Sequence, residues 1–138
     1  MMARGRKTTT RMRKSVSNGR SPGLGGATPA VIVQSLQPEG GTEEVQVKRI
    51  MFSAAEIGAA KSAAFKLGLF QFQPTIANFN EDDAVVISGA IGNQFSHNET
   101  ITMRVPEGWY VALLLEQLDP AGTSDVTYSL QLNYKVLN

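Results

Sequence analysis

The sequence predicts an all-β protein built as an antiparallel sandwich or barrel. Short stretches of apolar and polar residues alternate along residues 30–137, and turns rich in Pro and Gly separate them. The clearest stretch is VTYSLQLNYKVL, residues 126–137, in which every second residue from Val126 to Val136 is Val, Tyr or Leu. About seven such stretches at this spacing are typical of sandwiches and barrels.

Six further strands are predicted from shorter patterns. They cover residues 30–37, 43–52, 65–73, 83–91, 100–105 and 109–118. The segments PEGG, PEG and DPAGTSD supply turns between some of them. The strand at 109–118 is apolar along most of its length, which favours burial in a core or an interface. Trp109 and Tyr110 at its start are the candidate anchors of a subunit interface.

Residues 54–64 fit two structures. They are rich in alanine, and Ser53 precedes Glu56 by three residues, which is a capping-box pattern and favours a short helix. Gly58 weakens that helix. The alternative is an extended connection whose small side chains lie against a neighbouring subunit.

The N-terminal segment has a different composition from the rest. Residues 1–20 contain no acidic residue and seven basic ones: Arg4, Arg6, Lys7, Arg11, Arg13, Lys14 and Arg20. Few apolar side chains accompany them, so the segment cannot offset the entropy of ordering its backbone. A Gly/Pro-rich hinge, SPGLGGATPA, follows. We therefore expect a disordered basic arm over residues 1–29 and a folded domain over residues 30–138.

The charge of the arm opposes that of the rest. The arm carries +7, whereas the remaining residues hold six Lys or Arg and all twelve Asp or Glu, a net charge of −6. Arg and Lys on a mobile segment neutralise phosphates without reading bases, so the seven basic residues are the predicted nucleic-acid contacts. A nuclear-import signal or a solubility tail is the alternative.

The sequence shows no sign of an enzyme. Cysteine is absent, the one histidine, His97, lies in a polar segment, and no nucleophile motif is present. We therefore expect no catalytic residues, no small-molecule substrate and no cofactor. Glu81, Asp82 and Asp83 form an acidic cluster that is a weak candidate for calcium, with a solvated turn as the alternative.

The longest apolar runs are too short to span a bilayer, and the N-terminus lacks the apolar centre of a signal peptide. We therefore expect no membrane partner and an intracellular site of synthesis.

The layout resembles the coat proteins of small icosahedral viruses, such as satellite viruses and small circular single-stranded DNA viruses. A basic arm, a hinge and a compact β domain follow one another, and VKRIMFS (47–53) and GWYVALLLEQL (108–118) resemble strands of such coats. The resemblance implies an eight-stranded jelly roll, an arm directed inward, shells of sixty copies or multiples of sixty, and in some coats calcium between subunits. It also implies a place in the virion, after assembly in the host cytoplasm or nucleus.

The predicted function is therefore a capsid protein that self-assembles and packages viral genomic nucleic acid through its arm. Sixty arms would supply about 420 positive charges. A nucleic-acid-binding module acting as a small oligomer, and a structural cage or decoration protein, are the alternatives. A jelly roll needs one strand more than the seven predicted, and we expect it within residues 53–65 or as a second strand within residues 61–80.

Overall fold

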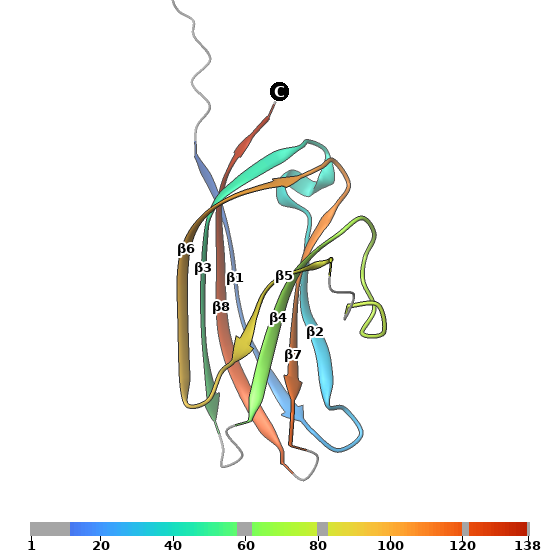
Figure 1. Ribbon diagram of the computed structural model, residues 1–138, viewed down its shortest axis with the longest axis vertical. Coiled ribbons are helices and arrows are strands. Elements are labelled where there is room, and N and C mark those ends of the chain that lie inside the picture. Colours follow the sequence, from blue (N-terminus) through green and yellow to red (C-terminus); the bar gives the residue numbers. More distant parts are fainter. Residues whose placement is uncertain (1–11, 58–61, 80–82, 120–121, 138) are drawn as a thin grey trace, which may run out of the picture.

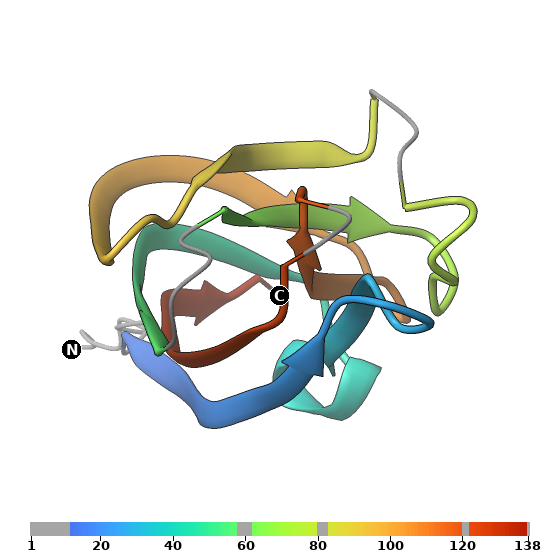
Figure 2. The same ribbon diagram turned by 90° about the horizontal axis from the view of Figure 1, so that it is seen from below.

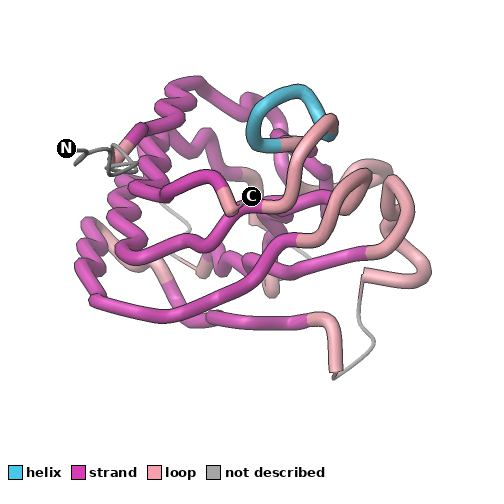
Figure 3. The backbone as a smooth tube through the Cα atoms, turned by 90° about the horizontal axis from the view of Figure 1, so that it is seen from above, coloured by secondary structure: helices cyan, strands magenta, loops and turns pink. Residues whose placement is uncertain are grey.

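The computed structural model describes residues 12–57, 62–79, 83–119 and 122–137. Its eight strands are β1 (Arg13–Leu24), β2 (Ala30–Leu36), β3 (Val45–Ile57), β4 (Ala63–Phe70), β5 (Val85–Ala90), β6 (Gln94–Val105), β7 (Tyr110–Gln117) and β8 (Ser124–Val136). A 3-10 turn over Pro38–Gly41 joins β2 to β3 and is the cyan turn of Figure 3. Within these residues no helix is long and apolar enough to cross a membrane.

The strands form two four-stranded antiparallel sheets. The first sheet has the order β1-β8-β3-β6 and the second has the order β2-β7-β4-β5. The two sheets face each other around a common interior, as the view along the strands shows (Figure 2). Eight strands in this order make a jelly roll, so the predicted fold class is confirmed.

Strict alternation explains the position of β8 at the centre of the first sheet. Every second residue of β8 from Ser124 to Val136 is buried, and the residues between them face outward. β8 pairs with β1 on one side and β3 on the other. A strand with one wholly apolar face therefore supplies the largest continuous part of the core.

Three phenylalanines join the sheets. The ring of Phe65 on β4 lies 4.5 Å from Phe52 on β3 and 4.9 Å from Phe95 on β6, measured between ring centres. These distances are typical of favourable aromatic contacts. Phe65 comes from the second sheet and its two partners from the first, so the cluster ties the layers together.

β7 is buried on both of its faces. Val111, Leu113 and Leu115 point into the interior, whereas Ala112 and Leu114 belong to a second apolar cluster. Phe79, from the connection between β4 and β5, completes that cluster. Its ring centre lies 4.7 Å from that of Phe70. The β4–β5 connection thus covers part of the outer face of the second sheet, which explains the unbroken apolar run of β7.

The eighth strand lies where the sequence predicted an arm. Residues 13–24 form β1 and pair with β8 from Arg13–Tyr134 to Leu24–Ser124. The domain boundary expected at residue 30 is therefore wrong, as is the location of the eighth strand within 53–65 or 61–80. The inner side of β1 carries Ser15, Ser17 and Gly19, and a Cβ at Gly19 would lie 2.5 Å from the Tyr128 hydroxyl oxygen. Glycine fits at position 19 because the Tyr128 ring occupies the space that a larger side chain would need.

Of the two structures left open for residues 54–64, the helix is wrong wherever the structure describes the chain. Residues 54–57 continue β3 and residues 63–64 begin β4, while 58–61 lie outside the described residues. Ala54 and Glu56 are buried, whereas Ala55 and Ile57 lie on the outer side, which is the alternation of a strand. Pairing with β6 and β8 therefore outweighs the helix propensity of alanine.

Candidate nucleic-acid interface

The seven basic residues predicted to bind nucleic acid divide into two groups. Arg4, Arg6, Lys7 and Arg11 lie outside the described residues. Arg13, Lys14 and Arg20 belong to β1. β1 begins at the end of the sandwich where β8 ends (Figure 1), so the chain before Met12 joins the folded body at that end.

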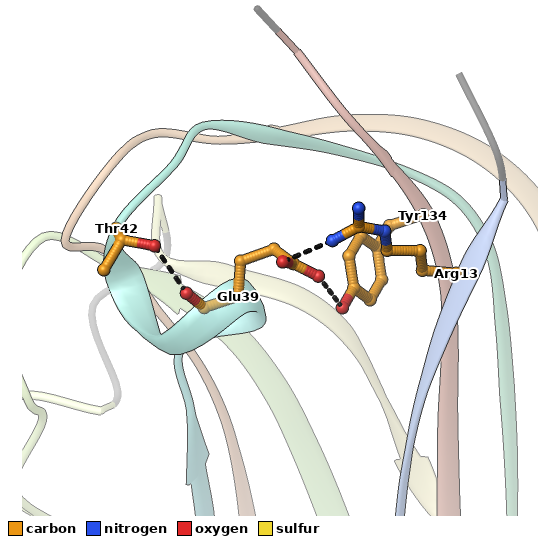
Figure 4. Close-up of polar contacts among 4 residues, drawn as sticks. All are labelled: Arg13, Glu39, Thr42 and Tyr134. Atoms are coloured by element: carbon orange, nitrogen blue, oxygen red, sulfur yellow. Dashed lines mark hydrogen bonds and ion pairs between the residues drawn. The ribbon is translucent and has the colours of Figure 1, made fainter. Parts of the chain in front are cut away.

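Arg13 is held by the turn between β2 and β3. Its Nη1 donates to Oε1 of Glu39 at 2.5 Å, and the hydroxyl of Tyr134 donates to Oε2 of the same carboxylate at 2.8 Å (Figure 4). Glu39 adopts a left-handed backbone conformation with φ of 58°, and the Thr42 hydroxyl donates to its carbonyl oxygen. The network thus fastens the start of β1 to β8 and to the turn.

Glu39 and Tyr134 in this network have shifted pKa values. The hydrogen bond from Arg13, followed by that from Tyr134, holds the pKa of the Glu39 carboxyl below its ordinary value. Burial and the hydrogen bond to Glu39 raise the pKa of Tyr134 to about 12. Both shifts favour a charged Glu39 that accepts a hydrogen bond from a neutral Tyr134.

Arg20 is paired near the other end of β1. Its Nη2 lies 2.6 Å from Oδ2 of Asp125, and the backbone N–H of Gly23 donates to Oδ1 at 2.9 Å. The hydrogen bond from Gly23, and then that from Arg20, lowers the pKa of the Asp125 carboxyl. Two of the three predicted arm cations on β1 are therefore engaged with carboxylates of the folded body.

Acid is expected to loosen the attachment of β1. The carboxyls of Glu39 and Asp125 have ordinary pKa values of 4.5 and 3.8, and both are lower in the folded chain. Their contribution to stability is therefore present above those ordinary values and is lost as pH falls through the lowered ones. We expect the free energy of unfolding, measured in urea from pH 7 to pH 2.5, to fall less steeply with acid in E39Q/D125N than in the parent chain.

E107Q removes an exposed carboxyl that forms no ion pair within the described residues, so it should keep the parent's acid dependence. An E39Q/D125N variant as acid-sensitive as the parent would contradict the assignment of this sensitivity to β1.

Most of the acidic cluster predicted to bind calcium lies outside the described residues. Glu81 and Asp82 lie outside the described residues, and Asp83 is exposed. No group of three or more His, Asp or Glu side chains suited to a metal occurs in the described part of the chain. Calcium at this position stays a prediction. His97 donates to or accepts from Glu99 at 2.7 Å and stacks on Phe95 at the edge strand β6.

Trp109 and Tyr110 are half-buried within the chain itself. Trp109 packs against the main core, and Tyr110 packs against the outer cluster around Phe70. Their role in a subunit interface stays a prediction.

Sequence reasoning missed four basic residues of the folded body, Lys48, Arg49, Arg104 and Lys135, which share a face with the predicted Lys14 and Arg20. Six cations lie on the outer face of the first sheet: Lys14, Arg20, Lys48, Arg49, Arg104 and Lys135. They come from four strands that are distant in sequence. The pairing of these strands brings the six residues together, and no local pattern in the sequence predicts this arrangement. The net negative charge of the body therefore hides a face rich in positive charge.

No family model and no curated protein matches the chain. A solved structure described as "Cyanophage Pam1 capsid asymmetric unit" contains a chain with a similar backbone, at 12% sequence identity and a TM-score of 0.48. The match covers 99% of this chain and 93% of that chain. A similarity at this level does not bear on what the present chain does.

Proposed function

We propose that the chain is a structural subunit of a viral shell, which self-assembles through its jelly-roll body and holds genomic nucleic acid with its basic N-terminal segment. Sixty copies would make the simplest closed shell for a subunit of this size. The proposed location of the protein is the virion.

The division of charge along the chain carries this proposal. Residues 1–11 hold four basic residues and no acidic one, whereas residues 12–138 hold nine basic and twelve acidic residues, a net charge of −3. β1, which follows the basic segment in the sequence, begins at the end of the sandwich where β8 ends (Figure 1). A subunit built this way can present its cations on one side while its body associates with other bodies.

The pairing of β1 reduces the charge that the segment can offer. Arg13 and Arg20 are bonded to carboxylates, which leaves Arg4, Arg6, Lys7, Arg11 and Lys14 of the predicted set. Sixty copies would then carry about 300 of these charges rather than about 420. Many weak contacts on one shell act together, so avidity makes the binding effective.

Size-exclusion chromatography with light scattering tests the proposal. The full chain is compared with R4Q/R6Q/K7Q/R11Q, which keeps the length of the segment and removes its charge. We expect the full chain to form a uniform megadalton-scale particle with a high ratio of absorbance at 260 to 280 nm. The variant should lose the nucleic acid, because its phosphate contacts are gone.

Two other results would overturn the proposal in different ways. Equal particles free of nucleic acid from both chains would indicate a cage or decoration protein. Small oligomers from both chains, with nucleic acid added over a range of salt, would rule out a shell. Binding of nucleic acid by such an oligomer would then indicate a binding module.

A further inference from the structure

The strand register gathers cations at one end of the outer face of the first sheet. Lys14 on β1 and Arg49 on β3 both pair with Asn133 of β8, on either side of it. In the next row Gln46 of β3 pairs with Lys135 on one side and Arg104 on the other. Adjacent strands lie about 4.8 Å apart, so these rows cross the sheet within about 15 Å.

A β-bulge adds one more cation to this end. The register of β3 shifts between Val47 and Arg49, against both β6 and β8. Val47 and Ile50 are both fully buried, so the two residues between them, Lys48 and Arg49, lie on the outer side. Regular alternation would have turned one of the two inward. The bulge thus places consecutive basic residues on one face.

Most of these cations have no counter-charge. Within the described residues Lys14, Lys48, Arg49 and Lys135 form no ion pair. Arg104 is paired with Glu44 at 2.5 Å, and Arg20 is paired with Asp125. We call the four unpaired residues the basic patch. Like charges this close repel one another, and an anionic partner relieves that repulsion.

Neutral polar groups make up much of the rest of the face, beside the apolar Val16, Met51, Ala55 and Ile57. The rows beside the basic patch carry Gln131, Ser129, Thr127, Ser53, Ser96, Asn98 and Gln94. Two shallow depressions lie among them, one beside Thr127 and one beside Gln131. Amide and hydroxyl groups of this kind supply hydrogen bonds to phosphate and sugar oxygens. No aromatic side chain stands among these outward positions, which favours contacts with the backbone over base stacking.

The described chain begins at the same end of the sheet. Lys14 is the first outward-facing residue of β1. In the sequence, residues 1–11 add four further cations before this strand. An extended polyanion such as nucleic acid can contact several cations of the basic patch at once, whereas a small anion contacts only one.

We propose that the outer face of the β1-β8-β3-β6 sheet binds the sugar–phosphate backbone of nucleic acid through Lys14, Lys48, Arg49 and Lys135. The proposal rests on the proposed function and deepens it, because it identifies which broad face of the subunit is turned toward the nucleic acid. The opposite broad face carries Lys66, which lies 3.6 Å from Glu116.

Fluorescence anisotropy with a labelled 30-nucleotide oligouridylate, titrated with the full chain at several salt concentrations, tests the face directly. K48Q/R49Q/K135Q should bind about tenfold more weakly or worse at low salt. Its slope of log K against log salt should be shallower by about 2, since each lost phosphate contact on a single strand removes about 0.7. R49Q alone should weaken binding, whereas the matched variant K66Q, on the other sheet, should not.

R4Q/R6Q/K7Q removes three charges from the N-terminal segment and separates the two surfaces. If R4Q/R6Q/K7Q weakens oligonucleotide binding while K48Q/R49Q/K135Q binds like the parent, the proposal for the face is wrong and the shell proposal stands. If the sheet variant loses binding only to phosphatidylserine–phosphatidylcholine vesicles, the face is directed to a membrane and the proposal is also wrong. The assay measures binding and chromatography measures assembly, so the two proposals can fail separately. Thermal melting confirms that each variant is folded.

Discussion

Replacing Phe65 by alanine is expected to lower the free energy of unfolding by about 3–5 kcal/mol. The Phe65 side chain is 1% exposed and contacts Phe52 and Phe95, which belong to the opposite sheet. Its removal costs the transfer of a large apolar group and leaves a cavity between the sheets. Domains of this size are stable by only about 5–15 kcal/mol, so urea unfolding should show a large shift of the midpoint.

F72A is the matched control for this substitution. Phe72 is 53% exposed in the β4–β5 connection, so its loss should change the free energy of unfolding by no more than about 0.5 kcal/mol. If F65A does not fold, F65L keeps most of the volume and should give an intermediate loss. Equal losses at Phe65 and Phe72 would contradict the role of the aromatic cluster.

A buried polar network centred on Glu56 is expected to have the second large effect on the free energy of unfolding. Glu56 on β3 is 3% exposed. Its Oε1 accepts from the backbone N–H of Ala63, at the start of β4, at 3.1 Å, and its Oε2 accepts from the Ser124 hydroxyl on β8. Ser124 Oγ accepts in turn from Nε2 of Gln117 on β7 at 2.6 Å. The carboxylate therefore connects both sheets.

E56A is expected to lower the free energy of unfolding by about 2–4 kcal/mol, because two buried donors lose their acceptor and each costs about 1–3 kcal/mol. E56Q keeps the side-chain shape and one acceptor oxygen, and should cost less. The measurement is urea unfolding at pH 7. E107A, on an exposed turn, is the matched control and should stay within about 0.5 kcal/mol of the parent.

A double-mutant cycle with S124A tests the network itself. Ser124 and Glu56 share a hydrogen bond, so the losses in E56A and S124A should not add in the double variant. Strictly additive losses would show that the two side chains act independently.

The strands with strong local patterns could be predicted from the sequence. β8 alternates over its whole length, and a strand buried on one face produces that pattern directly. The apolar run of β7 indicated burial, and the structure explains it by packing on both faces. These elements were found because each carries its own apolar surface.

β1 could not be predicted because its structure depends on its neighbour. Val16 is half exposed, and the inward residues are serines and a glycine, of which Gly19 leaves room for the Tyr128 ring of β8. A segment of this composition is indistinguishable from a disordered one until β8 is in place. The ion pairs of Arg13 and Arg20 are long-range in the same way, joining residues 26 and 105 positions apart.

The candidate interface was only partly visible in the sequence. The basic residues near the N-terminus stood out because seven of them fall within the first twenty residues. Lys48, Arg49 and Lys135 did not, because they meet Lys14 only through the pairing of three strands. The capping-box pattern at Glu56 fitted a helix as one of two alternatives, and nothing in the local sequence separates that position from a buried acceptor.

The two-sided burial of β7 has a consequence for any assembly of this chain. One broad side of the subunit is partly covered by its own β4–β5 connection, whereas the other is an exposed sheet rich in polar side chains. The two broad sides of the subunit therefore differ, and inverting one copy in a layer would place unlike surfaces side by side. A layer of copies in a single orientation inherits that difference, and its two sides then present unlike chemistry to whatever each side encounters.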